Sequence, residues 1–358
     1  MPVSSGPTDP GFPLALRTLG FDDRWAALFA ALPAEARPLR VVRGHRGAVI
    51  AAGDVDGVRL TTPPAQQPVV GDWVAAMNHR VVAIAERSSA VVRRRADGDP
   101  HVLAANVDLV GIVHGLDQPL NRRRLERGLV LAWESGAHPV VILTKADVAG
   151  DPVEAARIAA ASGPGVEVVV ASVVDGRGLG DVRGLLQPNR TMALIGASGS
   201  GKSSLANALL DTEAMTTQPV RVGDRRGRHT TTHRELLIVP GGGILLDTPG
   251  LRALTIGAAA DGVDKTFPEI DQLSEGCRFG DCRHDREPGC AVLAALESGT
   301  LAADRFEGWR RVRREADNAR LRADPVALRQ RNRQWGRFAR EAAHHKRRPD
   351  SRRGRDGK

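Results

Sequence analysis

Three short segments of this chain stand in an order that limits what the chain can fold into. Thr144-Lys-Ala-Asp147 comes first, Gly196-Ala-Ser-Gly-Ser-Gly-Lys-Ser203 second and Asp247-Thr-Pro-Gly250 third. The second segment fits the phosphate-loop pattern GxxxxGK[ST], which in an ordinary GTPase precedes the other two. A sheet keeps the same neighbours when its old termini are joined and new ones are cut. We therefore expect a circularly permuted α/β nucleotide-binding domain.

The phosphate-loop segment has the sequence context that its chemistry needs. A strand-like apolar run, 191–195, precedes it, and residues 204–210 continue as a good helix former. Lys202 can place its charge on the β- and γ-phosphates, and the Ser203 hydroxyl can bind Mg²⁺. The alternative is a Gly/Ser-rich turn before a core helix. The candidate nucleotide contacts are Gly196, Ala197, Ser198, Gly199, Ser200, Gly201, Lys202, Ser203 and Ser204.

A strand-like apolar run, 243–247, leads into the third segment and ends at its first residue, Asp247. Its carboxylate, Asp247, can hold Mg²⁺ through water, and the backbone N–H of Gly250 can reach the γ-phosphate. Otherwise Asp247 is a turn residue.

The first segment is a candidate guanine-reading site, because the apolar run 139–143 delivers it to the carboxyl edge of a parallel sheet. The Asp147 carboxylate can accept hydrogen bonds from N1–H and the 2-amino group of guanine, which adenine cannot offer. An Asp that caps the next helix would explain the segment equally well. A further strand, 166–170, leads to a loop placed to offer a backbone N–H to guanine O6. The candidates are Thr144, Lys145, Ala146, Asp147, Ser172 and Val173.

The threonine-rich segment 227–232 is the candidate switch. One of the three threonines there, Thr230, Thr231 or Thr232, can bind Mg²⁺ and sense the γ-phosphate. Leu251 stands where many GTPases carry the glutamine that orients the attacking water, so we expect slow intrinsic hydrolysis. His229 is the candidate to position that water, since imidazole can accept a proton near neutral pH. A solvated, β-prone loop with an exposed histidine is the alternative.

A second cluster, Cys277-x4-Cys282-x-His284-x5-Cys290, uses all 3 cysteines of the chain. Three thiolates and one imidazole form a closed tetrahedral set that suits structural zinc. Disulfides are the competing explanation. The odd count, the neighbouring histidine and the lack of a secretory leader favour a reduced metal site in a cytoplasmic protein.

Charge is spread unevenly over the 358 residues. The formal net charge is +9, and residues 305–358 hold 19 Lys and Arg against seven Asp and Glu, a net +12. Such a basic extension fits a phosphate-backbone partner, with a solvated helix and tail as the alternative. No segment has 18 consecutive apolar residues, so we expect no membrane-spanning helix.

The N-terminal part has short β runs at 47–50, 57–60, 71–74, 80–84 and 90–92. Five such strands predict a small OB-like barrel, although an SH3-like barrel is also compatible. We expect a multidomain fold: an N-terminal extension with one helix (1–36, helix 21–32, residues 1–11 disordered), the barrel (37–95), the permuted GTPase domain (100–255), a zinc-binding and helical domain (256–345) and a basic tail (346–358).

On these residues the chain resembles the circularly permuted bacterial GTPases of small ribosomal subunit biogenesis, the family of ribosome small-subunit-dependent GTPase A. The resemblance runs over nearly the whole chain, from Val69-Val-Gly-Asp72 through the guanine motif, GASGSGKSSL, GRHTTT and DTPG to the Cys/His cluster. It implies GTP or GDP with Mg²⁺ on residues 144–147 and 196–204, and one structural Zn²⁺ on Cys277, Cys282, His284 and Cys290. It also implies that ribosomal RNA binds to the barrel and the zinc domain.

The chain departs from the family pattern at Thr144, where the family usually has asparagine. The hydrogen bond that the asparagine amide makes to the phosphate loop is therefore expected to weaken. We expect a monomeric GTP hydrolase that matures the small ribosomal subunit. Two other classes of function remain. One is an RNA-binding assembly factor with a merely regulatory nucleotide site, and the other is a phosphate-loop ATPase or kinase.

Overall fold

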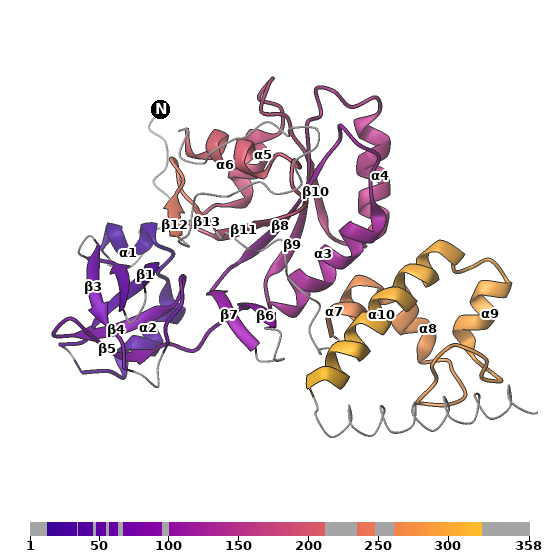
Figure 1. The fold of residues 1–358 in the computed structure, drawn as a ribbon, viewed down its shortest axis with the longest axis horizontal. Coiled ribbons are helices and arrows are strands. Elements are labelled where there is room, and N and C mark those ends of the chain that lie inside the picture. The colour runs from indigo at the N-terminus through magenta and orange to yellow at the C-terminus, as the bar shows by residue number, and fades with distance from the viewer. Residues whose placement is uncertain are drawn as a thin grey trace, which may run out of the picture.

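The computed structural model describes residues 13–33, 35–45, 48–54, 57–63, 67–94, 100–211, 235–247 and 261–323. In chain order, the described parts form a small β-barrel, a central α/β domain and a helical domain (Figure 1). Several expectations concern residues outside this part. These residues are 1–11, the switch segment 227–232, Gly250, Leu251 and the basic tail. Within the described residues, no helix combines the length and the apolar character that crossing a bilayer requires.

The barrel closes on itself through five strands. The strands pair in the order β1-β2-β3-β5-β4, and β4 pairs back onto β1. The pairing of β3 with β5 is parallel, and the other pairings are antiparallel. Apolar side chains from alternate positions, among them Leu39, Leu60 and Val74, fill the interior. The OB-like barrel is therefore confirmed, with strands β1 (Arg37–His45), β2 (Ala48–Ala52), β3 (Val58–Thr61), β4 (Trp73–Met77) and β5 (Arg80–Ile84).

One predicted barrel strand was wrong. The run 90–92 lies in β6 (Ala90–Arg94), which pairs with β7 (Pro100–Ala105) as a separate two-stranded sheet. The first barrel strand is instead β1, in which Arg37, Arg40 and Arg43 interrupt the apolar pattern.

Two short helices cover one side of the barrel. They are α1 (Leu14–Thr18) and α2 (Asp23–Ala30). The predicted helix 21–32 begins later because the Asp22 carboxylate accepts a hydrogen bond from the Trp25 N–H and caps α2. Phe21 and Trp25 pack against Trp73 of the barrel, with ring centroids 5.0 and 5.9 Å away.

The α/β domain continues the same sheet. Strands β10, β9, β8, β11 and β13 are parallel, and β12 is antiparallel to β13 and pairs at one position with β1 of the barrel. The predicted strands 139–143, 166–170, 191–195 and 243–247 are confirmed within a residue or so. The bounds are β8 (Leu109–Gly115), β9 (His138–Thr144), β10 (Glu167–Val170), β11 (Thr191–Ile195), β12 (Glu235–Ile238), β13 (Ile244–Asp247), α3 (Arg122–Glu134), α4 (Pro152–Ser162), α5 (Leu179–Leu185) and α6 (Lys202–Leu210).

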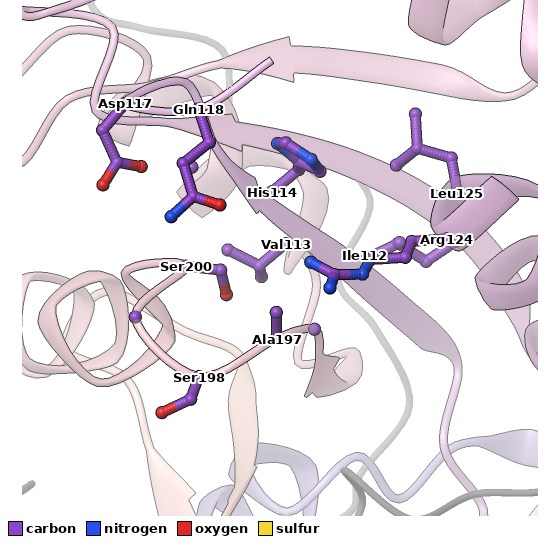
Figure 2. Close-up of a pocket in the computed structure, with 13 residues that line it drawn as sticks. Ile112, Val113, His114, Asp117, Gln118, Arg124, Leu125, Ala197, Ser198 and Ser200 are labelled. Carbon is purple, nitrogen blue, oxygen red and sulfur yellow. The ribbon is translucent and has the colours of Figure 1, made fainter. Parts of the chain in front are cut away.

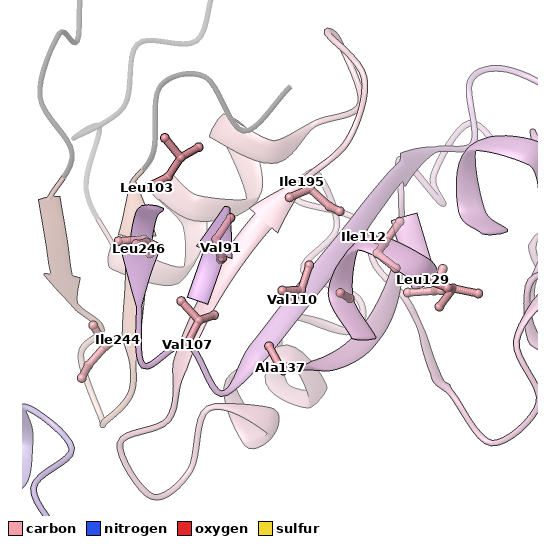
Figure 3. Close-up of a cluster of buried hydrophobic side chains, with 14 of the residues drawn as sticks. Val91, Leu103, Val107, Val110, Ile112, Leu129, Ala137, Ile195, Ile244 and Leu246 are labelled. Carbon is pink, nitrogen blue, oxygen red and sulfur yellow. The ribbon is translucent and has the colours of Figure 1, made fainter. Parts of the chain in front are cut away.

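Segments on both sides of the phosphate loop in sequence lie beside β11 in space. β8 pairs with β11 on one side and β13 pairs with it on the other. One face of this sheet packs on α3 and on the β6–β7 hairpin, where Val91, Leu103, Val110, Ile112 and Leu129 share a core (Figure 3). The sheet thus has the neighbours that the permuted domain requires.

The described C-terminal part of the chain, 261–323, forms four helices, of which α7 and α10 pack on α3. They are α7 (Asp261–Thr266), α8 (Pro268–Ser274), α9 (Ala291–Glu297) and α10 (Ala303–Ala323). The side chain of Arg305 on α10 is 7% exposed and forms an ion pair with Glu126 of α3, at 3.4 Å. Arg305 also donates to the carbonyls of Ser162, at 2.9 Å, and Thr266, at 2.5 Å. This one guanidinium therefore joins the helical domain to α3 and α4.

A second buried arginine holds the barrel against the α/β domain. Arg40 of β1 is 2% exposed, and it donates to the carbonyls of Leu19 at 2.5 Å, Asn106 at 2.9 Å and Gly71 at 3.4 Å. Burial lowers its pKa to about 10, while Asp108 and Asp72 oppose that shift, so Arg40 stays charged at neutral pH. Its three acceptors come from the α1–α2 segment, the barrel and the start of the α/β domain.

We expect Arg40→Met to destabilise the protein by about 3 kcal/mol or more, because the buried Leu19 and Asn106 carbonyls lose their donor and the Gly71 carbonyl keeps only the Asn106 amide. Urea unfolding followed by tryptophan fluorescence measures this, since Trp73 is buried between the barrel and the α1–α2 segment. The control is Arg59→Met on an exposed position of β3, which should shift stability by no more than about 0.5 kcal/mol. Equal unfolding midpoints for the two variants would contradict the role given to Arg40.

Candidate functional site

The phosphate-loop segment forms a loop between β11 and α6. Gly196, Gly199 and Gly201 have φ values of +150°, +76° and +86°. A Cβ atom on Gly196 would lie 2.3 Å from the Val113 carbonyl, so only glycine fits there. Helix α6 begins at Lys202, and its first backbone N–H groups open onto the loop. The loop has the geometry of an anion-binding site.

The ammonium group of Lys202 lies over this loop. Its Nζ donates to the carbonyls of Gly196, at 2.9 Å, and Ala197, at 2.5 Å, and it lies 3.3 Å from the Ser200 hydroxyl. The charge is therefore held beside the loop, where phosphate oxygens bind in such loops.

The predicted guanine segment meets the phosphate loop directly. Thr144, the last residue of β9, is 2% exposed, and its hydroxyl donates to the Ser200 carbonyl at 2.6 Å. The two segments thus lie side by side at the carboxyl edge of the sheet. The threonine keeps a side-chain hydrogen bond to the phosphate loop.

The next two side chains of the guanine segment are held in place by partners. Lys145 has φ +60°, unusual for a residue with a side chain, and its Nζ lies 2.6 Å from the Asp117 carboxylate. Asp147 is exposed, and it accepts a hydrogen bond from the Ser172 hydroxyl at 2.6 Å. This bond leaves the outer oxygen of the Asp147 carboxylate available to a base.

The Ser172 backbone has a different role from the one that its position suggests. Its N–H donates to the Arg177 carbonyl at 2.9 Å and closes the loop. The Ser172 N–H is therefore engaged within the loop, and Val173, the other residue expected to offer an N–H to guanine O6, is exposed.

The catalytic and magnesium candidates lie mostly outside the described residues. Asp247 is the last residue of β13, beside β11. His229, Thr230, Thr231 and Gly250 fall in segments that the structure does not describe.

A pocket beside the phosphate loop contains residues that the sequence reasoning missed. His114 lies in β8, Asp117 lies just after this strand, and Arg124 lies in α3 (Figure 2). The His114 Nε2 accepts a hydrogen bond from the Asn121 N–H at 3.2 Å, and burial lowers the pKa of this imidazole, so it is neutral at pH 7. The sequence could have indicated His114 and Asp117, because they lie at or just beyond the end of β8, which also ends at the carboxyl edge of the parallel sheet where ligands bind.

The predicted metal ligands also come together. The ligand atoms of Cys277, Cys282, His284 and Cys290 all lie within 4.8 Å of one another. Sulfur atoms of Cys277 and Cys290 are 3.8 Å apart, and the His284 Nδ1 lies 3.3 Å from the Cys290 sulfur. All three cysteines are free thiols. The spacing and the donor set fit one tetrahedrally coordinated metal ion.

The helical domain packs around this cluster. Trp309 of α10 lies 5.4 Å from the His284 ring, and Phe306 and Val312 belong to the same core as Cys290. Helix α10 therefore packs against the cysteine region.

Comparisons with known proteins agree with this geometry. The sequence profile of the RsgA GTPase family matches residues 84–257. A small ribosomal subunit biogenesis GTPase RsgA from Streptomyces coelicolor is 46% identical over 334 residues, which cover 87% of this chain and 90% of that protein. The chain belongs to the RsgA family of GTPases.

Solved structures share the fold. The crystal structure of YjeQ from Thermotoga maritima is 25% identical with a TM-score of 0.60, and the match covers 78% of this chain and 98% of that one. YloQ, described as a circularly permuted GTPase, is 24% identical with a TM-score of 0.58, and the match covers 80% of this chain and 96% of that one. The permuted order deduced from the motifs is confirmed.

We expect Thr144→Val to weaken GDP binding by about 5- to 10-fold, because the hydrogen bond that braces the phosphate loop at Ser200 is lost while the side-chain shape is kept. Thr144→Ser retains the hydroxyl and should bind GDP like the wild type. Titration calorimetry with GDP measures both. If Thr144→Val binds as tightly as Thr144→Ser, the hydrogen bond does not organise the site.

Proposed function

We propose that this protein is a GTP hydrolase that binds ribosomal RNA and acts late in the assembly of the small ribosomal subunit. The observation that carries the GTPase part is the junction of the guanine segment with the phosphate loop, made by Thr144 and Ser200. The assembly role follows from membership of the RsgA family, whose Streptomyces coelicolor member is named for small-subunit biogenesis. We place the protein in the cytoplasm as a monomer.

Guanine recognition falls to Asp147. Its carboxylate accepts from N1–H and the 2-amino group of the base, and the Ser172 hydroxyl fixes its orientation. The stem of Lys145 lies along the base plane, steered by the ion pair with Asp117. The Val173 N–H donates to guanine O6. Ala146 lies between Lys145 and Asp147 in the guanine segment. Adenine lacks the two donors that Asp147 requires, so we expect selectivity for guanine.

The phosphate loop and neighbouring residues bind the phosphates and Mg²⁺. Backbone N–H groups of residues 199–204 bind phosphate oxygens, and Lys202 neutralises the β- and γ-phosphates. The Ser203 hydroxyl binds Mg²⁺, and Asp247 holds the ion through water. Gly250 and one of Thr230, Thr231 and Thr232 sense the γ-phosphate. His229 positions the attacking water, because Leu251 stands where many GTPases carry a glutamine.

Zinc is the metal that fits the cysteine and histidine cluster. The donor set is three sulfurs and one imidazole nitrogen, which zinc prefers in closed structural sites. The ion would tie the loop 277–290 to α9, since Cys290 is also the N-cap of that helix. It has no open coordination position, so its role is structural.

Ribosomal RNA binds to the barrel and the zinc domain in this proposal. Helix α10 carries exposed Arg314 and Arg320, and the sequence continues with a further excess of basic residues. Because Arg305 joins α10 to α3, the docking surface and the nucleotide domain are parts of one packed body. Contact with RNA can therefore affect the hydrolytic site, and nucleotide state can affect docking.

We expect Asp147→Asn to change the base preference of the site from guanine to xanthine. The Asn amide still accepts from N1–H, but its NH₂ group now faces the 2-amino group of guanine and instead suits the 2-oxo group of xanthine. Affinity for GDP should fall at least about 100-fold, and xanthosine diphosphate should bind. Competition binding against both nucleotides measures this.

The matched control is Asp175→Asn, in the loop that follows Ser172, because Asp175 pairs with Arg177 rather than with a base. It should retain the preference for GDP. Continued guanine preference of Asp147→Asn would contradict the site as described.

We expect one zinc ion per chain, and we expect Cys282→Ser to lose it together with the fold of residues 277–290. Metal content by mass spectrometry and thermal unfolding with and without a chelator measure these effects. Ser274→Ala, just before the cluster, is the control and should keep the metal. A wild-type chain that contains no zinc and melts at the same temperature with chelator would refute the zinc assignment.

A further inference from the structure

The first turn of α3 carries an unusual run of charge. Arg122, Arg123 and Arg124 occupy it, and the turn contains no acidic residue. Cations at a helix N-terminus oppose the helix dipole, at a cost of about 0.3–1 kcal/mol each. Helix stability therefore does not explain them. Arg122 pairs with Asp304 of α10, which accounts for one of the three.

Arg124 differs from Arg123 in where it lies. Both are exposed, but only Arg124 lines the pocket beside the phosphate loop. Figure 2 shows its side chain extending from α3 past Ile112 toward Val113 and Ala197. Within the described part of the chain, no hydrogen bond or ion pair engages the Arg124 guanidinium. An exposed cation that has no partner among the described residues thus faces the phosphate loop.

The side of the loop that Arg124 faces is the one that holds the terminal phosphate. Lys202, whose ammonium serves the β- and γ-phosphates, donates to the carbonyls of Gly196 and Ala197. The base binds at the other side, where Thr144 contacts Ser200. The nucleotide therefore runs from the Ser200 side toward Ala197 and Ser198. The pocket that Arg124 lines extends along this stretch of the loop, from Gly196 to Ser200.

The reaction needs a positive charge at this place. Water oxygen bonds to the γ-phosphorus while the bond to the β–γ bridging oxygen breaks, the electron pair goes to the β-phosphate of GDP, and the water proton ends on the released phosphate. Negative charge grows on the phosphate oxygens in the transition state, and a guanidinium fork matches them well. Leu251 cannot orient water as a glutamine does, so charge stabilisation matters more here.

Resting on the proposed GTPase function, we propose that Arg124 is a catalytic residue for GTP hydrolysis. It contacts the γ-phosphate from within the same chain and stabilises the charge that develops there. It makes no contact with the base, the α-phosphate or the Mg²⁺ ligands, and GDP binding does not depend on it.

The test compares full-length Arg124→Ala, Arg124→Lys and Arg123→Ala without ribosomal subunits. Single-turnover GTP hydrolysis should slow about 100- to 1000-fold in Arg124→Ala, less in Arg124→Lys, and no more than about twofold in Arg123→Ala, which removes the same charge from the same turn. GDP affinity should stay within about twofold of the wild type in all three. Arg124→Ala should also lose the tight complex of GDP with aluminium fluoride, which mimics the transferring phosphoryl group.

Unchanged hydrolysis in Arg124→Ala, or a loss of GDP affinity as large as the loss of rate, would overturn the proposal. Retained GDP binding also shows that the variant is folded. A wild-type chain that binds GDP but hydrolyses no GTP would overturn the proposed function itself, so the two failures are distinguishable.

Discussion

The site depends on one hydrogen bond, from the Thr144 hydroxyl to the Ser200 carbonyl. It joins the segment that reads the base to the loop that binds the phosphates, although these segments are 56 residues apart and in permuted order. Both ends of the bond are buried within the carboxyl edge of the sheet, so it fixes the distance between the two halves of the nucleotide site. The parallel pairing of β8 and β13 with β11 makes this contact possible, and the order of the chain does not matter to it.

Helix α3 connects this site to the rest of the molecule. Its first turn faces the phosphate loop through Arg124, and its middle packs on the helical domain. There Glu126 pairs with the buried Arg305, and Arg127 pairs with Glu315 at 3.0 Å. Burial raises the pKa of Glu126, whereas Arg305 opposes the shift, so each charge needs the other to remain buried. The helical domain is therefore tied to the same helix that presents Arg124.

The sequence predicted those parts whose signals are local. The strands around residues 139–143 and 191–195 are short apolar runs, and the metal cluster has a fixed spacing. The strand β1 was missed because Arg40 interrupts its apolar pattern, and the three carbonyls that satisfy Arg40 are distant in sequence. For the same reason the hydrogen bond from Ser172 to Asp147 was not foreseen, and Arg124 was indistinguishable from its two arginine neighbours. Long-range partners decide these cases, and no local pattern encodes them.

In the proposed mechanism, the guanine site drives GTP hydrolysis that is coupled to the small ribosomal subunit. The rate of GTP hydrolysis by the purified protein, alone and with isolated small subunits, tests this coupling, with ATP as the control nucleotide. We expect a low rate for the protein alone, strong stimulation by the subunits and no hydrolysis of ATP. A low rate that subunits leave unchanged, or equal hydrolysis of ATP, would contradict the proposed mechanism.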